Sequence, residues 1–270
     1  MRTVFFISDR TGLTAEALGN SLLTQFTKIE FKRINLAFID TPKKAKMAAT
    51  QIKEASELDG QPALIFSTQI SQEYHQLLID SGGIVFDFFD TFISKLEDIL
   101  GVESSHTVGL SHSMINENTY GDRIDSINFV LNNDDGLNTK NYDTADIILT
   151  GVSRSGKTPT CLFLALQYGI YAANYPLIED DFKTIKLPPI LQKYKGKLFG
   201  LTINPVRLQN IRDERRSNSG YASIDQCRKE VKLAEDIFVQ NQVPFIDTSH
   251  TSIEEIAGRI LNKSKIERRY

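Results

Sequence analysis

Short apolar segments alternate with longer amphipathic segments along most of the chain. In the first hundred residues the apolar segments are rich in Val, Ile and Phe, and each precedes a stretch in which apolar positions recur with helical spacing. We predict strands at 3–7, 34–39, 63–66 and 84–88. This alternation is typical of a parallel sheet whose strands are connected by helices. Residues 1–101 are therefore predicted to form one α/β domain.

Capping residues mark where several of these helices begin and end. Thr41 followed by Pro42 predicts one helix start, and Ser71 predicts another, because a side-chain oxygen at this position accepts from a free backbone N–H. Gly82 and Gly101 stand where glycine commonly ends a helix.

A second alternation follows a polar segment. Residues 102–143 are rich in Ser, Asn, Asp and Gly, and we interpret them as a connection that contains one helix at about 120–131. From residue 144 onwards we predict strands at 146–152, 198–203 and 243–246, each followed by a helix. Capping boxes are predicted at Ser223–Gln226 and Ser252–Glu255. The predicted fold is an N-terminal Rossmann-like domain (1–101), a connecting region (102–143) and a second α/β domain (144–270).

Composition narrows the class of protein. The 270 residues are enough for about two domains, and 41% hydrophobic content gives each a core. The 31 Lys and Arg residues against 34 Asp and Glu leave a net charge of −3, which does not favour nucleic acid as a partner. No apolar run approaches the ~20 residues of a membrane span. Two cysteines, Cys161 and Cys227, are too few for a disulfide framework, so we expect core packing and a cytoplasmic location.

The strongest chemical signal is the segment 151–158, GVSRSGKT, which matches the P-loop pattern G-x-x-x-x-G-K-[ST] between a predicted strand and a predicted helix. Gly151 and Gly156 allow the backbone N–H groups to turn toward one anion, and Lys157 would contact phosphate oxygens. Thr158 would offer its hydroxyl to Mg²⁺. A chance glycine-rich turn is the alternative. The predicted nucleotide-binding residues of this loop are Gly151, Val152, Ser153, Arg154, Ser155, Gly156, Lys157 and Thr158.

Two further segments carry charged or hydroxyl side chains at strand ends. The turn 8–16, SDRTGLTAE, follows the first strand, where ligands bind in open α/β sheets. An ordinary helix start with Thr11 or Thr14 as N-cap fits it equally well. Arg207 and Arg212 belong to an arginine cluster that follows a strand predicted beside the P-loop strand, and guanidinium groups suit phosphate oxygens. A solvated helix face is the alternative.

Several single residues are weaker candidates. Carboxylates at strand ends can hold Mg²⁺ or accept a hydroxyl proton, although most such residues cap helices or turns; the candidates are Asp9, Asp40, Asp87, Asp90 and Asp247. The pair Asp134–Asp135 before Gly136 could present two carboxylates, but Asp-Gly is first a turn signal. His112 could contact phosphate, although a lone histidine is more often structural.

Several separated motifs together resemble a known family. The motifs GVSRSGKTPT, AANYPL, KLFGLTINPVRLQNIRDERR, YASIDQCRKEV and SIEEIA occur in order, with FFISDRTGLTAEALG and RIDSINFVLNNDDG before them. This composite closely resembles the phosphoenolpyruvate synthase regulatory protein family, a sister group of the pyruvate, phosphate dikinase regulatory proteins. It covers nearly the whole chain. Arg10 departs from the SDGTG of many relatives, and YASIDQCRKEV favours the synthase regulators.

The resemblance implies a bifunctional enzyme, a serine/threonine kinase and pyrophosphorylase. Such an enzyme inactivates the synthase by phosphorylating a threonine with ADP, and restores it with inorganic phosphate, releasing pyrophosphate. The implied ligands are ADP, Mg²⁺ and inorganic phosphate, and the implied protein substrate is phosphoenolpyruvate synthase; a homodimer is left open. Lys157, Thr158 and Asp9 are the predicted catalytic residues, since phosphoryl transfer needs mainly positioning and charge neutralisation.

The residues alone are compatible with other functions. The same chemistry could act on the dikinase. A P-loop and arginines also fit a small-molecule kinase, and a nucleotide sensor without turnover would use the same loop. Motifs of a conventional protein kinase are absent from the sequence.

Overall fold

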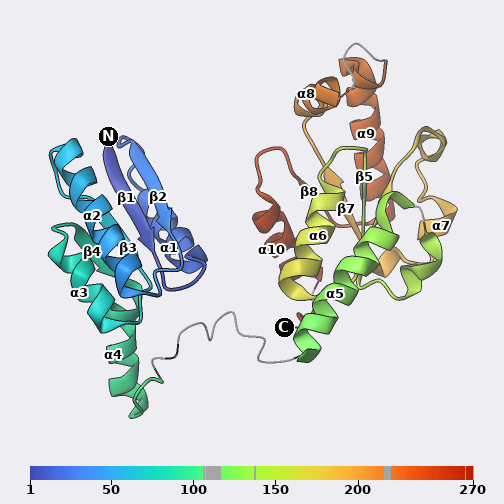
Figure 1. Cartoon of the computed structure of the whole chain (residues 1–270). Helices are drawn as coiled ribbons and strands as arrows, with labels where there is room; N and C mark the ends of the chain where they lie inside the picture. Colours follow the sequence, from blue (N-terminus) through green and yellow to red (C-terminus); the bar gives the residue numbers. More distant parts are fainter. Residues whose placement is uncertain (106, 108–116, 137, 216–219, 265, 270) are drawn as a thin grey trace. The chain divides into compact units, whose positions relative to one another are not determined.

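The computed structural model describes residues 1–105, 107, 117–136, 138–215, 220–264 and 266–269. The chain divides into two compact units, Met1–Ser113 and Met114–Tyr270 (Figure 1). Each unit contains a four-stranded parallel sheet, which confirms the predicted α/β class. The division falls inside the predicted connection 102–143, because the helix at 117–132 and the two 3-10 turns after it belong to the second unit.

The first unit alternates strictly between strands and helices. Its elements are β1 (Arg2–Ile7), α1 (Leu13–Leu23), β2 (Phe31–Leu36), α2 (Pro42–Asp59), β3 (Leu64–Ser67), α3 (Gln72–Asp80), β4 (Ile84–Asp87) and α4 (Phe88–Leu100). The sheet order is β2-β1-β3-β4, with β1 buried along almost its whole length. One core cluster lies between the sheet and α2, and another lies between the sheet and α1.

The second unit begins with α5 (Glu117–Asn132), which packs against α6 (Lys157–Tyr168). Its sheet has the order β6-β5-β7-β8, the same relative order as in the first unit. The strands are β5 (Ile147–Gly151), β6 (Ala172–Pro176), β7 (Leu198–Thr202) and β8 (Phe245–Asp247). The remaining helices are α7 (Pro189–Gln192), α8 (Pro205–Arg215), α9 (Ile224–Asn241) and α10 (Ile253–Ser264). Short 3-10 turns are η2 (Asp134–Gly136), η3 (Thr139–Asp143), η4 (Glu179–Lys183), η5 (Lys195–Lys197) and η6 (Gly220–Ala222).

Two core clusters cover the two faces of this second sheet. Residues of α6 and α10 form one cluster with the sheet, and residues of α9 form the other. Strand β5 is buried at all five positions, as expected for the central strand of a parallel sheet. The chain adds β6 on one side of β5 and then β7 on the other side. The loop after β5 therefore lies where open α/β sheets bind ligands.

The strand predictions were wrong in two places. Strand β6 was not predicted, because its sequence AANYP lacks the β-branched residues that favour strands. The second strand was predicted at 34–39 but lies at Phe31–Leu36. It is an edge strand with exposed Lys32 and Arg33, so its apolar residues are too few to mark its start.

The helix signals were largely confirmed. Thr41 and Ser71 cap α2 and α3 through their side chains, and Gly101 ends α4 in the left-handed conformation. At Ser223 only half of the predicted capping box forms: its hydroxyl accepts from Gln226 N–H, while the Gln226 side chain donates to Glu230. None of the described helices is long and apolar enough to cross a membrane.

Candidate functional site

The segment 151–158, which matches the P-loop pattern and is called the P-loop below, joins strand β5 to helix α6, the context that the motif requires. Gly151, the last residue of β5, has φ +148°, and a Cβ there would lie 2.2 Å from the carbonyl oxygen of Leu201 on the neighbouring strand. Gly156, with φ +88°, is the N-cap of α6. Both glycines are therefore required by the backbone: the first by close approach of β7, and the second by its left-handed conformation.

The backbone of this loop is arranged to receive an anion. The N–H groups of Arg154 and Gly156 have no hydrogen-bond partner among the described residues, whereas Ser155 N–H donates to Val152 O at 3.3 Å. The N-terminus of α6 adds the positive end of the helix dipole. A phosphate group therefore fits this cradle by both geometry and charge.

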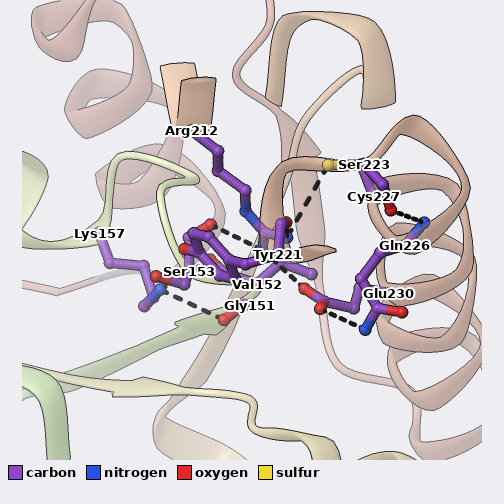
Figure 2. A network of polar contacts seen from close by, with 10 residues as sticks. All are labelled: Gly151, Val152, Ser153, Lys157, Arg212, Tyr221, Ser223, Gln226, Cys227 and Glu230. Atoms are coloured by element: carbon purple, nitrogen blue, oxygen red, sulfur yellow. Dashed lines mark hydrogen bonds and ion pairs between the residues drawn. The ribbon is translucent and has the colours of Figure 1, made fainter. Parts of the chain in front are cut away.

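Lys157, at the first position of α6, is 4% exposed and lies within the loop. Its ammonium donates to Gly151 O at 3.2 Å and to Val152 O at 2.9 Å (Figure 2). Burial lowers the pKa of Lys157 to about 8, and the negative charges of Asp135 and Asp134 oppose this shift. The lysine is thus a buried cation whose charged state a phosphate would favour.

Thr158 belongs to a cluster that the chain assembles from three separate segments. Its hydroxyl donates to Asp134 Oδ1 at 2.8 Å, and Asn174 Nδ2 donates to the same oxygen. Asn174 is completely buried on β6, next to β5, and its Oδ1 accepts from Asp135 N–H at 3.0 Å. The turn after α5 is thereby fixed beside the P-loop.

The pair of Thr158 hydroxyl and Asp134 carboxylate has the donor chemistry that Mg²⁺ uses. Mg²⁺ commonly takes only one or two protein oxygens and completes its shell with water and substrate phosphate. Among the described residues no group of three or more His, Cys, Asp or Glu could hold a metal. Thr158 and Asp134 are therefore the two residues that could supply protein ligands to such a Mg²⁺ ion.

Asp135, the residue after Asp134, carries a second carboxylate in this turn. Its side chain is exposed, and its backbone has φ 50° and ψ 29°, a left-handed conformation that Asp tolerates better than most residues. Its charge is the strongest of those that favour the protonated form of Lys157. The predicted Asp-Gly turn forms at Asp135–Gly136, and of its two carboxylates Asp134 contacts Thr158 directly, whereas Asp135 acts on Lys157 through its charge.

The two predicted arginines occupy different environments on α8. Arg207 is exposed, whereas Arg212 has no exposed surface. Arg212 forms an ion pair with Glu230 at 2.6 Å and donates to the carbonyl oxygens of Tyr221 (3.0 Å) and Ser153 (3.3 Å) (Figure 2). The guanidinium thus contacts the P-loop from within the protein.

A second buried group supports the other side of the loop. The hydroxyl of Thr248, which follows β8, lies 3.2 Å from Ser155 O and 3.0 Å from Thr202 O, and its single proton is shared between these two acceptors. Thr248 and Asn174 were both missed as site residues. The only sequence signal for Asn174 was its place in the AANYPL motif, and Thr248 had none.

The N-terminal turn belongs to the other unit. Asp9 is buried, one of its carboxylate oxygens has no hydrogen-bond partner among the described residues, and burial raises the pKa of Asp9. Gly12, with φ +77°, is the N-cap of α1, so neither Thr11 nor Thr14 caps this helix. Lys157 and Thr158 are consecutive residues at the start of α6 in the second unit. The catalytic assignment of Asp9 stays a prediction.

Two of the weaker carboxylate candidates have structural partners. Asp87 caps α4 by accepting from Phe89 N–H and Asp90 N–H, and Asp40 pairs with Lys44. Cys161 and Cys227 are completely buried in the core clusters, as predicted. His112 lies outside the described residues.

Comparison with known proteins gives concordant results over the whole chain. Residues 4–261 match the model of the kinase/pyrophosphorylase family. A protein of Alkalilimnicola ehrlichii, provisionally named phosphoenolpyruvate synthase regulatory protein, is 53% identical over 268 residues, covering 99% of this chain and 97% of its own length. Proteins with the same provisional name from Stutzerimonas stutzeri and Pseudomonas aeruginosa are each 51% identical, over 99% and 100% of this chain and 98% of their own lengths.

Proposed function

The chain belongs to the kinase/pyrophosphorylase family, to which the phosphoenolpyruvate synthase regulatory proteins also belong, and we propose the following reactions for it. With ADP as donor, it phosphorylates a threonine of phosphoenolpyruvate synthase and inactivates that enzyme. With inorganic phosphate, it removes the phosphoryl group, releases pyrophosphate and restores the synthase. The family and its kinase/pyrophosphorylase description support the class of chemistry, and the provisional names of the relatives support the target.

The observation that carries the proposal is the arrangement around Lys157. One P-loop with free amides, a buried cation and the Thr158–Asp134 pair stand together in the second unit. Phosphoryl transfer requires positioning and neutralisation of negative charge, and these groups supply both. ADP would place its β-phosphate in the loop, and Mg²⁺, held by Thr158 and Asp134, would neutralise charge on the phosphates.

In the kinase direction, the loop amides and Lys157 hold the β-phosphate while a threonine hydroxyl of the target attacks its phosphorus. The new bond joins threonine oxygen to phosphorus, the bond to the bridging oxygen of ADP breaks, and AMP leaves. The hydroxyl proton passes to a carboxylate. We assign this role to Asp135, because its side chain is exposed and its negative charge acts on Lys157.

In the opposite direction the same cradle holds inorganic phosphate. A phosphate oxygen attacks the phosphorus of phosphothreonine, the bond to threonine oxygen breaks, and pyrophosphate forms. The attacking phosphate gives its proton to the same carboxylate, which passes it on to the threonine oxygen. Because both reactions use one anion site, Lys157→Ala is expected to abolish both.

The test uses the purified full chain with phosphoenolpyruvate synthase, ADP and Mg²⁺. Synthase activity and threonine phosphorylation are followed first; inorganic phosphate is then added and pyrophosphate is assayed. Loss and then recovery of synthase activity is expected with the wild-type chain, and neither with Lys157→Ala. A variant that loses one activity and keeps the other would contradict the single site.

Parallel variants identify the proton acceptor. Asp9→Asn, Asp134→Asn and Asp135→Asn are compared in both assays, and the largest fall is expected for Asp135→Asn in the phosphorylation step. If ADP leaves the synthase unaffected, the same assay with pyruvate, phosphate dikinase tests the sister target. Binding of ADP without turnover on either protein would favour a sensor, and phosphorylation of a metabolite with ATP would favour a small-molecule kinase.

A further inference from the structure

Arg212 is the largest side chain that is fully buried in the described part of the chain. Its guanidinium joins three segments: Glu230 on α9, the Tyr221 carbonyl in η6 and the Ser153 carbonyl in the P-loop. A buried guanidinium is costly unless its charge and donors are paired. A buried cation therefore lies directly against the P-loop, and its charge is paired with Glu230.

The contact with Ser153 decides which way a loop amide points. A peptide unit is planar and trans, so the carbonyl of Ser153 and the N–H of Arg154 point in opposite directions. Because Arg212 draws the Ser153 carbonyl toward itself, the Arg154 N–H is turned away from the guanidinium. That N–H has no hydrogen-bond partner among the described residues.

The loop needs this external support because its local conformation is unfavourable. Arg154 has φ +76°, in the left-handed region that residues other than glycine rarely adopt. Such a conformation persists only where surrounding contacts hold it. On one side Arg212 holds the carbonyl of Ser153, and on the other Thr248 holds the carbonyl of Ser155.

Glu230 fixes Arg212 in turn. Its Oε2 lies 2.6 Å from Arg212 Nη2, and its Oε1 accepts from Gln226 Nε2 at 2.8 Å, one turn earlier on α9. The ring of Tyr221 covers one face of the guanidinium, with the guanidinium carbon 4.0 Å from the ring centroid. The orientation of Arg212 is thus set by a long helix and an aromatic ring (Figure 2).

This arrangement leaves no exposed part of Arg212 for a ligand. We propose that Arg212 is a positioning residue: the buried Arg212–Glu230 pair holds the Ser153–Arg154 peptide in the orientation that receives phosphate, without touching the nucleotide. This replaces our prediction from the sequence that Arg212 contacts the ligand. The part that concerns phosphate rests on the proposed function, whereas the part that concerns the loop conformation does not.

The experiment uses four variants of the full chain. Arg212→Met with Glu230→Met removes both charges at once, and buried ion pairs replaced by apolar residues of similar volume usually leave a folded protein. Arg212→Lys keeps the charge but lacks the planar fork that serves three oxygen acceptors. Glu230→Gln removes only the anchor. The matched control is Arg228→Met, an exposed arginine of α9 whose surface ion pair with Asp225 spans 3.8 Å.

Two measurements are made on each variant: hydrogen exchange of the amides at 152–156, and the dissociation constants of ADP and inorganic phosphate by calorimetry. We expect faster exchange in the double variant, in Arg212→Lys and in Glu230→Gln. We also expect binding about tenfold weaker, the effect of losing one hydrogen bond of ordinary strength. Arg228→Met should match the wild type in both.

Glu230→Gln separates positioning from direct contact. If Arg212 touched the phosphate, removing the competing carboxylate would leave binding unchanged or strengthen it, and that result would overturn the proposal. Unchanged exchange and binding in a folded double variant would overturn it as well. If the double variant does not fold, Arg212→Lys and Glu230→Gln decide in the same way. Should the wild-type chain bind neither ADP nor phosphate, the proposed function fails, and the exchange rates still decide the role of Arg212.

Discussion

The hydroxyl of Thr158 donates a 2.8 Å hydrogen bond to Asp134, a residue 24 positions earlier in the chain. This bond ties the first turn of α6 to the turn that follows α5. It brings together a hydroxyl and a carboxylate on the side of the P-loop where a nucleotide-bound Mg²⁺ would need oxygen ligands.

Asp134→Asn tests whether the carboxylate supplies charge to a metal. The amide keeps the shape of the side chain but removes its negative charge, so we expect both the phosphorylation and the phosphorolysis rates to fall by about 10²-fold or more. Rates are measured across a Mg²⁺ titration. Asp143→Asn, at an exposed position paired with Lys193, should retain wild-type rates. Full activity of the Asp134 variant would remove this residue from the mechanism.

Asn174→Ala tests how Asp134 is held in place. Asn174 is completely buried and bonds both Asp134 and the backbone of Asp135, so its loss should loosen both carboxylates. We expect the Mg²⁺ concentration for half-maximal activity to rise by about 10- to 100-fold, the usual effect of removing a group that orients a metal ligand. Asn241→Ala, on α9, is the control. An unchanged Mg²⁺ dependence would show that Asp134 does not need this support.

The pH dependence of ADP binding should report on Lys157. Its pKa is lowered to about 8 by burial, so below pH 8 the empty protein already carries the ammonium that the phosphate needs. Above pH 8 the lysine is neutral and must take up a proton on binding, so affinity should decrease as pH rises, by about tenfold between pH 7 and pH 9.

Calorimetry in buffers of different ionisation enthalpy measures that proton uptake directly. Lys157→Arg, whose side chain stays charged throughout this range, should bind with no such pH dependence. A wild-type affinity that is constant from pH 7 to pH 9 would contradict a titrating Lys157.

Gly151→Ala tests the close approach of strand β7 to the loop. The new methyl group would lie 2.2 Å from Leu201 O, at a residue with φ +148°, so the strands must separate. We expect the free energy of unfolding of the second unit to fall by about 2–5 kcal/mol. Urea denaturation measures it. Gly196→Ala, where no heavy atom lies within 4 Å of the new Cβ, should change stability by less than about 0.5 kcal/mol. Equal stability of both variants would contradict the steric argument.

The sequence alone determined the features that depend on local geometry. The backbone conformations of Gly151 and Gly156 were predictable because a loop that turns successive amides toward one anion demands glycine at fixed positions, and the binding role of Lys157 stays a prediction. The alternation of strands and helices was also predictable from local sequence, because the spacing of apolar residues follows the residues that each element buries. The ordered motifs sufficed to predict the family, which the comparisons confirmed.

Only the tertiary structure decided which distant residues meet at the loop. Asn174 lies on a strand that its own composition does not predict, and its contact with Asp134 spans 40 residues. Arg212 looked like a ligand contact because it follows a strand end, yet packing of α8 against α9 buries it against Glu230 and Ser153. Burial and pairing depend on how elements pack together, and no local pattern of residues contains that information.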